Sequence, residues 1–446
     1  MGTALMLRLA YFLAAVTTLA PMLAWAADPS ESQWGQWRGP LASGVAPLGD
    51  PPTKWSEQQN VRWKAEIPGV GSSTPIVWGD RIFLLTVIKT DRAAENAVPA
   101  AEQPQRPFGI VFPTTYHQFV VLCVDRRTGK TLWQQVAAEL VPHEGVHPDN
   151  DYASASPVTD GQRLYASFGS HGVYCYDLDG KLLWKRNVAQ LKTRNSFGEG
   201  SSPALYGDTL VTVWDQEGPS FIEAMDAATG ETRWKKEREE VTSWATPLIV
   251  ERAGRTQVIV NATKRVRSYD LKSGDLIWEC GGQVTNVTPS PVANEKLVFC
   301  TSGYRGSALV AMPFDQAGDL TETDKIAWQH DRGTPYVPSP LLYGERLYIT
   351  QSNNGILTCL DASSGKVLID RTRLPGISAL YGSPVGAANR VYLTSRDGAT
   401  LVIKNADTLE VLAENKLDEE FDASPAICGK ELFLRGKKYL YCLAEE

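Results

Sequence analysis

A small residue followed by proline recurs along the chain at a nearly constant interval, and this repeat limits the possible folds more than any other feature. The prolines of these pairs are Pro75, Pro157, Pro203, Pro247, Pro291, Pro340, Pro384 and Pro425, and the steps between them are 82, 46, 44, 44, 49, 44 and 41 residues. A period in the mid-forties is the length of one four-stranded blade of a β-propeller. The eight copies therefore predict eight blades.

The second copy shows how one blade is built. A short run, "ASPVTD", is followed by "RLYASFG" and "GVYCYDL", in which large and small residues alternate, and then by "KLLWKRNV". Asp-Gly pairs at 160–161 and 179–180 mark turns. Alternation with period two indicates strands, and no long stretch keeps a helical period. We predict an all-β, eight-bladed β-propeller of four-stranded antiparallel blades.

The two ends of the repeat predict how the ring closes. The last copy ends in "KKYLYCLAEE" after three strands, and the missing fourth pattern, "VRWKAEI", stands at residues 61–67 before the first copy. Pairing of this strand with the C-terminal strands would close the last blade and remove an open sheet edge. We expect residues 61–446 to form a single propeller, and residues 27–60 to form an extension that packs on a flank of the ring through Trp34 and Trp37.

Residues 1–26 have the pattern of a secretory signal peptide, with one Arg, an apolar run and an A-x-A cleavage site. Pro21 interrupts the run, which is also short for a membrane span, so a cleaved signal is favoured over an anchor. No later segment is long and apolar enough to cross a bilayer. We expect a periplasmic or secreted mature chain that is a monomer.

The charge balance argues against one class of partner. The chain has 44 Lys and Arg against 51 Asp and Glu, with no basic cluster. A surface that binds nucleic acid needs clustered Lys and Arg to neutralise phosphates. We therefore expect no nucleic-acid partner.

Four of the seven cysteines occupy one repeat position, where other copies carry Ala or Ser. These four are Cys123, Cys175, Cys359 and Cys442. A position that accepts Cys, Ala or Ser is typical of a small buried site. We predict mostly unpaired, structural thiols and leave the pairing of Cys280, Cys300 and Cys428 open.

A second motif, A-x-D-x-x-T-G-x-x-x-W, links the third and fourth strands of several copies. It reads "AMDAATGETRW" at residues 224–234, "CVDRRTGKTLW" at 123–133 and "SYDLKSGDLIW" at 268–278. Asp and Gly suit the turn, and the indole offers a wide face for the gap between blades. We predict structural roles for Trp63, Trp133, Trp184, Trp234, Trp278 and Trp328.

This motif resembles the tryptophan-docking repeat of the pyrroloquinoline-quinone (PQQ) type β-propellers, and the resemblance covers essentially the whole mature chain. It implies the propeller fold. That superfamily includes dehydrogenases that use PQQ and calcium in a central funnel, an outer-membrane assembly lipoprotein that binds partner proteins, and many exported proteins. The adjacent cysteine pair that alcohol-oxidising members commonly carry is missing from this chain, and so is the lipid-bearing cysteine of the assembly lipoprotein.

Two functions follow from the resemblance. The first is a binding or scaffold module in the cell envelope, for an envelope protein segment or for an anionic glycan or small molecule. The alternative is a PQQ- and calcium-dependent alcohol or sugar dehydrogenase. Neither cofactor is assigned from the sequence.

Candidate site residues lie in loops on the propeller face opposite the D-x-x-T-G turns, because loops before the proline positions and after second strands share that face. The loop at residues 141–157 brings His143, His147, Asp149, Asp151 and Tyr152 to this rim. Carboxylates are the ligands that calcium prefers. The candidates for a metal are Asp149, Asp151 and Glu199, and those for a general base are Asp149, Asp151 and Asp422.

Basic and aromatic residues on the same rim are candidates for ligand binding, together with His147 and Glu199. The basic residues are Arg194, Lys264, Arg305, Arg396 and Arg435, and the aromatic ones are Trp244, Tyr336 and Tyr381. If the basic side chains converge, they form a positive ring suited to an anionic ligand. The alternatives are solvated turn residues and packing between blades.

The first copy is longer than the others because of an insertion at about residues 88–117. The insertion is rich in Ala, Pro, Glu and Gln and contains "FGIVFP". Its place between second and third strands puts it on the same face as the candidate site. We expect a lid, a loop that docks a partner, or a tolerated surface insertion.

Overall fold

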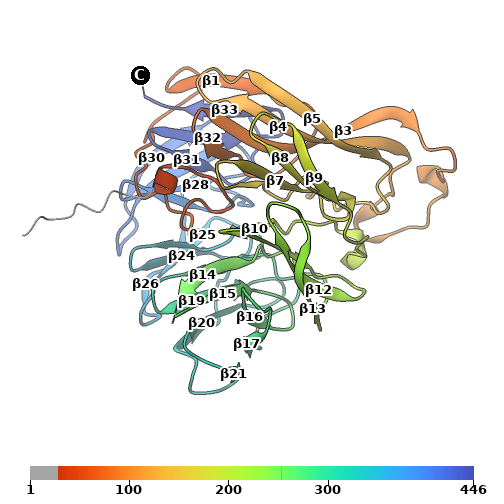
Figure 1. Cartoon of the computed structure of the whole chain (residues 1–446). Coiled ribbons are helices and arrows are strands. Elements are labelled where there is room, and N and C mark those ends of the chain that lie inside the picture. The colour runs from red at the N-terminus through yellow and green to blue at the C-terminus, as the bar shows by residue number, and fades with distance from the viewer. Residues whose placement is uncertain (1–28, 253, 446) are drawn as a thin grey trace, which may run out of the picture.

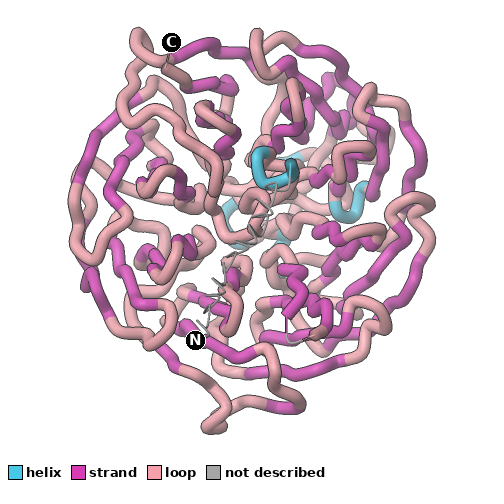
Figure 2. Tube along the Cα trace, turned by 60° about the vertical axis from the view of Figure 1, so that its left-hand side comes forward, coloured by secondary structure: helices cyan, strands magenta, loops and turns pink. Residues whose placement is uncertain are grey.

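The computed structural model describes residues 29–252 and 254–445, so the predicted signal peptide lies outside the described residues. Eight antiparallel sheets stand in a ring around a centre (Figures 1 and 2). Helical structure within the described ranges is limited to short 3-10 turns. The prediction of an all-β, eight-bladed propeller is confirmed.

The strands follow the repeat, four to a blade. Blades 1 and 2 contain β2 (Ile76–Trp78), β3 (Arg81–Ala93), β4 (Thr115–Asp125), β5 (Thr131–Leu140), β6 (Val158–Thr159), β7 (Arg163–Ser167), β8 (Val173–Asp177) and β9 (Leu182–Arg186). Blades 3 and 4 contain β10 (Ala204–Tyr206), β11 (Thr209–Trp214), β12 (Ser220–Asp226), β13 (Thr232–Arg238), β14 (Leu248–Arg252), β15 (Arg255–Val260), β16 (Val266–Asp270) and β17 (Leu276–Cys280).

The second half of the ring repeats this order. Blades 5 and 6 contain β18 (Val292–Ala293), β19 (Leu297–Ser302), β20 (Ala308–Pro313), β22 (Trp328–His330), β23 (Leu341–Tyr343), β24 (Arg346–Thr350), β25 (Ile356–Asp361) and β26 (Val367–Arg373). Blades 7 and 8 contain β27 (Val385–Ala387), β28 (Arg390–Thr394), β29 (Ala399–Lys404), β30 (Val411–Lys416), β31 (Ala426–Cys428), β32 (Glu431–Arg435), β33 (Tyr439–Leu443) and β1 (Val61–Glu66). The 3-10 turns are η1 (Pro29–Ser32), η2 (Ala100–Glu102), η3 (Pro107–Gly109), η4 (Gly169–His171) and η5 (Arg194–Ser196).

The ring closes through the N-terminal strand. Strand β1 pairs antiparallel with β33, with Trp63 opposite Cys442 and Glu66 opposite Tyr439. The predicted closure is confirmed, and the last blade has its fourth strand. Blade 4 gains a fifth strand that the repeat did not predict, because β21 (Gly318–Asp319), from the long β20–β22 connection, pairs parallel with β17.

The motif tryptophans lie at the seams between blades. The indole Nε1 of Trp63 donates to the Arg126 carbonyl of the next blade at 2.9 Å, and Trp184 donates in the same way to Ala227. Each ring also lies against the glycine of that blade's turn. A Cβ on Gly129 would lie 2.7 Å from the Trp63 ring, and Gly129 has a φ of +72°, so a side chain is excluded there.

A ring of hydroxyl groups ties the blades together near the axis. Each residue before a repeat proline is Ser or Thr, and the backbone N–H of all but the last, Ser424, donates to the hydroxyl of the equivalent residue in the next blade. Seven such bonds of 2.8–3.0 Å run in order through Thr74, Ser156, Ser202, Thr246, Ser290, Ser339, Ser383 and Ser424. At the seam between blades 8 and 1, Thr74 Oγ1 is buried without a hydrogen-bond partner in the described residues.

The first residues of the segment before β1 reach the centre of the ring, and later residues pack on blades 7 and 8. Trp34 forms a backbone bridge with Val77 of blade 1, whereas Trp37 Nε1 donates to Ser290 Oγ of blade 5 at 3.2 Å. The buried Arg38 donates to the carbonyls of Pro340 and Pro384. Farther along, the Trp55 N–H donates to Asn415 Oδ1 of blade 7 at 2.8 Å.

All seven cysteines are buried and free, so the predicted absence of a disulfide framework is confirmed. Burial raises the pKa of the Cys123, Cys175, Cys359 and Cys442 thiols to about 12. They are therefore protonated, packed groups in the blade cores.

The hydroxyl ring can be tested with two isosteric substitutions. Thr246→Val removes the acceptor for the Ser202 N–H and leaves this buried donor unpaired, so we expect a loss of about 1–3 kcal/mol in the free energy of unfolding. Thr74→Val at the equivalent position removes a hydroxyl without a partner and is expected to cost nothing. Urea unfolding of both variants is the measurement, and equal losses would contradict the assigned role.

Candidate functional site

A cavity of about 350 Å³ opens at the centre of the ring, on the face that carries the loops before the repeat prolines. We call it the funnel. Six hydroxyls of the ring described above line its wall, and Trp37 lies at its base, where it also contacts a second cavity of about 520 Å³ on the opposite face. The size of the funnel is typical of a site for a small molecule.

The loop at residues 141–157 reaches across the mouth of the funnel. Asp149 accepts a hydrogen bond from the Tyr381 hydroxyl at 3.0 Å and contacts Arg396 Nη1 at 3.0 Å. Arg396 also holds both oxygens of Asp422, at 2.6 and 3.1 Å. The structure thus joins four predicted residues, Asp149, Tyr381, Arg396 and Asp422, although the chain separates the first two by 232 residues.

These contacts shift the pKa values of the side chains at the mouth of the funnel. Burial would raise the pKa of Asp149, but the hydrogen bond from Tyr381 and the contact with Arg396 outweigh it and lower this pKa. Burial and the neighbouring Asp149 raise the pKa of Tyr381 to about 12. The guanidinium of Arg396 lies 4.0 Å from the centre of the Tyr381 ring. The positive charge of Arg396 is therefore paired with the carboxylates of Asp149 and Asp422 and with the face of the Tyr381 ring.

Asp151 and His147 have local roles in the same loop. Asp151 accepts bonds from the Ser72 hydroxyl and from the Ala153 N–H at 2.7 Å. His147 Nδ1 accepts the Asp149 N–H at 3.1 Å, and its ring packs between Phe108 and Phe197. Asp151 therefore stabilises the conformation of the loop. Of Asp151, His147 and Asp149, only the last two line the funnel.

Glu199 lies in the loop between β9 and β10, where the funnel meets a smaller side pocket of about 50 Å³. It keeps partial access to the cavity, but protein atoms surround its carboxyl group. Burial raises its pKa to about 7, the N–H of Ser170 at 3.0 Å opposes this shift, and Glu144 adds to it. Of the predicted carboxylates that line the funnel, it is the one without a cationic partner among the described residues, and such groups often mark functional sites.

The predicted basic residues do not form a ring around the funnel. Arg435 is buried at the seam of blades 8 and 1, where Nη1 donates to Ser73 Oγ and to the Leu85 carbonyl. Burial lowers its pKa to about 10. Lys264 and Arg305 are exposed, and Arg194 lies beside Thr285. No Lys or Arg in the described ranges lines the funnel or its side pocket, so the positive ring is not formed.

The aromatic residues are brought together more closely than the sequence indicated. Trp244, Tyr336 and Tyr381 line the funnel. The ring of Tyr336 lies 4.8 Å from that of Tyr304, between centroids, and Trp244 Nε1 donates to the Gly198 carbonyl at 2.7 Å. Sequence reasoning missed four further aromatic side chains of the wall, which no repeat position marks: Trp37, Phe108, Phe197 and Tyr304.

The insertion continues the sheet before it becomes a loop. Lys89 of β3 still pairs with His117 of β4, and β3 extends to Ala93, so the loop itself is shorter than predicted. Its tip places Phe108 against His147 and Phe197 at the edge of the funnel, with 61% of the Phe108 side chain exposed. Figure 1 shows this segment in orange, projecting from the ring.

Eight blades with the tryptophan motif at their seams, around a funnel on one face, define a PQQ-like β-propeller. A family model described as outer membrane protein assembly factor BamB (PQQ_2) matches residues 117–371, and the chain belongs to that family. No curated protein sequence matches the chain.

Solved structures share the fold at low identity. BamB from Moraxella catarrhalis is 12% identical, with a TM-score of 0.53, and the match covers 80% of this chain and 97% of that one. Quinohemoprotein alcohol dehydrogenase from Comamonas testosteroni is 10% identical, with a TM-score of 0.61 and coverage of 93% and 81%. The computationally designed Ika8 protein is 13% identical, with a TM-score of 0.54 and coverage of 75% and 95%. An assembly factor, a dehydrogenase and a designed protein share this fold, so the fold does not select a function.

The funnel residues do not fit PQQ with calcium. The aromatic wall would suit a planar ring, but PQQ carries three carboxylates and the funnel presents no free basic group to them. The candidate calcium ligands face different partners: Asp149 faces Arg396, Asp151 faces Ser72, and Glu199 faces Ser170. Within residues 29–252 and 254–445, no three His, Cys, Asp or Glu side chains gather to hold a metal ion.

The raised pKa of Glu199 predicts a pH-dependent stability. Its folded pKa of about 7 lies above the ordinary 4.5, so this group favours the folded state below pH 4.5, and that contribution is lost as pH rises to about 7. Glu199→Gln resembles the protonated form. We expect it to raise the free energy of unfolding by about 1–3 kcal/mol at pH 8.5 and to leave it unchanged at pH 4.5.

Urea unfolding at the two pH values measures this difference. The control is Glu231→Gln on an exposed turn, which should show no pH-dependent gain. A Glu199 variant with the same change in stability at both pH values would contradict the desolvated state of this carboxyl group.

Proposed function

We propose that this protein is a binding protein of the cell envelope whose funnel holds a neutral or positively charged small ligand with a flat, ring-shaped face, such as a sugar. The observation that carries this proposal is the composition of the funnel wall, in which aromatic faces and hydroxyl groups surround carboxylates without a free cation. Aromatic faces with a few well-placed polar groups are typical of small-molecule sites.

The carboxylates of the funnel wall argue against the anionic ligand that the sequence suggested. Asp149, Asp422 and Glu199 line the funnel, and Arg396 is the only Lys or Arg that forms an ion pair with any of them among the described residues. An anionic ligand would meet these carboxylates with no free guanidinium to pair with. A neutral or positive ligand meets no such penalty.

The wall also offers the geometry that a ring needs. Tyr304 and Tyr336 form one stacking surface, and Trp37 forms the base. Hydroxyls of the central ring, such as Ser290 and Ser339, point to the same space and can donate to or accept from a polyol.

Two observations support a place in the envelope. The first residues have the pattern of a secretory signal, and the family is described as an outer membrane protein assembly factor. Among the described residues, no helix has the length and apolar character that a membrane span needs.

A ligand panel tests the proposal. Isothermal titration with neutral disaccharides, amino sugars, uronic acids and PQQ plus calcium should give binding for the neutral or positive compounds only. Tyr336→Ala should weaken this binding at least tenfold, since it removes half of the stacking pair. Tyr206→Ala, on the cavity of the opposite face, should have no effect. Tight retention of PQQ, or selective binding of uronic acids, would overturn the proposal.

A separate observation favours a second candidate, the binding of a protein segment. The insertion exposes three apolar side chains, Val98, Phe108 and Val111, and exposed apolar groups often mark interaction sites. Replacement of Val98 and Val111 by Ser leaves Phe108 in the funnel wall, so it should abolish co-purification of an envelope partner and preserve small-ligand binding. Unchanged co-purification would remove this candidate.

A further inference from the structure

A side pocket of about 50 Å³ opens from the wall of the funnel between blades 2 and 3. It shares Ser154, Glu199, Gly200 and Trp244 with the funnel, so a ligand bound in the funnel can extend into it. The pocket is therefore large enough for a small polar group about the size of a water molecule.

Glu199 is held at the entrance of the side pocket by the η4 turn. The Ser170 N–H donates to its carboxyl oxygens at 3.0 and 3.2 Å, and a Cβ on Gly169 would lie 1.8 Å from Oε2. Gly169 also has a φ of +55°, so only glycine can form this cradle without strain. The backbone and the side chain of Ser170 both contact this carboxylate, and its remaining lone pairs are left as acceptors.

No Lys or Arg of the described residues forms an ion pair with this carboxylate. Glu144 accepts bonds from the N–H and hydroxyl of Thr193. Burial and neighbouring histidines lower the pKa of His171 to about 3, and His143 Nε2 contacts the Leu191 carbonyl and not Glu199. The Tyr152 hydroxyl donates to the Glu144 carbonyl.

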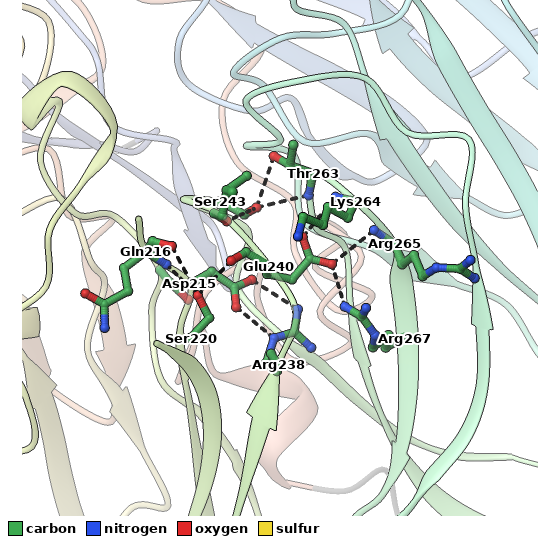
Figure 3. A network of polar contacts seen from close by, with 12 residues as sticks. Asp215, Gln216, Ser220, Arg238, Glu240, Ser243, Thr263, Lys264, Arg265 and Arg267 are labelled. Carbon is green, nitrogen blue, oxygen red and sulfur yellow. Dashed lines mark hydrogen bonds and ion pairs between the residues drawn. The ribbon is translucent and has the colours of Figure 1, made fainter. Parts of the chain in front are cut away.

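The guanidinium of Arg238, whose partner Asp215 lines the side pocket, is not free to pair with Glu199. Arg238 holds Asp215 through Nε and Nη2 at 2.7 and 3.0 Å, with both side chains fully buried, and its Nη1 donates to the Tyr269 hydroxyl. Figure 3 shows this pair beside a second one, in which Glu240 contacts Arg267 and accepts the N–H groups of Lys264 and Arg265. This network holds the wall of the side pocket in place and neutralises Asp215. Arg238 and Arg267 are paired with Asp215 and Glu240, so neither of them pairs with Glu199.

Aromatic faces complete the side pocket. Trp244 is oriented by its bond to the Gly198 carbonyl, and the buried Trp214 stacks on Phe221 with ring centroids 5.8 Å apart. Tryptophan faces attract cations, most strongly where water is excluded. A free carboxylate and two indoles in one small pocket therefore suit an ammonium group.

We propose that the side pocket binds the primary ammonium group of the funnel ligand, with Glu199 as its counter-ion and Trp244 as an aromatic wall. This inference rests on the proposed binding function and narrows the ligand to an amine. An ammonium group donates three hydrogen bonds, which match the unused acceptors of Glu199. A neutral hydroxyl gains less, and an anion is repelled by Glu144 and Glu199.

Binding of the amine would be coupled to the release of a proton from Glu199. The pKa of Glu199 is about 7 because of burial, and a bound cation favours the charged carboxylate and lowers this pKa. The affinity for an amine should therefore rise as pH increases to about 7 and level off above it, with release of a proton in the acidic range. An uncharged analogue should show no such rise.

The experiment compares 2-phenylethylamine with its isostere 2-phenylethanol by isothermal titration of the mature protein at pH 5.5, 7 and 8. We expect the amine to bind at least tenfold more tightly at pH 8, with a smaller advantage at pH 5.5. Glu199→Gln should remove the advantage and preserve the affinity for the alcohol, whereas Glu231→Gln should change neither.

The outcomes separate the two proposals. Equal affinity for amine and alcohol, or an advantage that survives Glu199→Gln, overturns the ammonium site and leaves the funnel as a binding site. No binding of either compound, together with no binding of the neutral disaccharides, overturns the funnel proposal itself. Unfolding curves of the Glu199 variant establish that it is folded.

Discussion

The hydrogen bond from one blade's backbone to the next blade's hydroxyl is the interaction on which this structure depends. A blade of four strands cannot bury both faces alone, so it needs a neighbour at a fixed distance and angle. Near the axis, the Ser or Thr before each repeat proline sets that distance. At the other end of the seam, the tryptophan indole bonds to the next turn, as Trp63 does with Arg126. Four of the eight seams have both bonds, and these two fixed points leave little freedom for rotation between the blades concerned.

The funnel is a consequence of this ring and of the segment that enters it. Arg38 donates to the carbonyls of Pro340 and Pro384, which directly follow two residues of the hydroxyl ring. The same segment carries Trp37 to the base of the funnel, where it bonds to Ser290. An N-terminal extension therefore converts the centre of the ring into a cavity with a base, and the loop at residues 141–157 narrows its mouth.

The ion pairs of Arg396 then determine the charge of the funnel wall. Arg396 could have made the funnel positive, but Asp149 and Asp422 take its hydrogen bonds and leave an acidic, aromatic site. Glu199 stays apart from this cluster and keeps a raised pKa because burial outweighs its hydrogen bonds with Ser170. The fold is shared with an assembly factor and a dehydrogenase, so these few side chains, and not the propeller, carry the functional argument.

The sequence by itself determined the number of blades, their strand order and the closure by β1, because those features repeat along the chain or complete an unfinished copy. It also placed the candidate residues on one face. Only the tertiary structure decided which of them meet. Asp149 accepts a hydrogen bond from Tyr381, which lies on a distant blade of the ring. Arg435 is buried in the seam between blades 8 and 1, and Glu199 packs against Gly169. The physical reason is that strand periodicity is local, whereas a rim contact depends on how far each loop reaches over a ring that brings distant blades together.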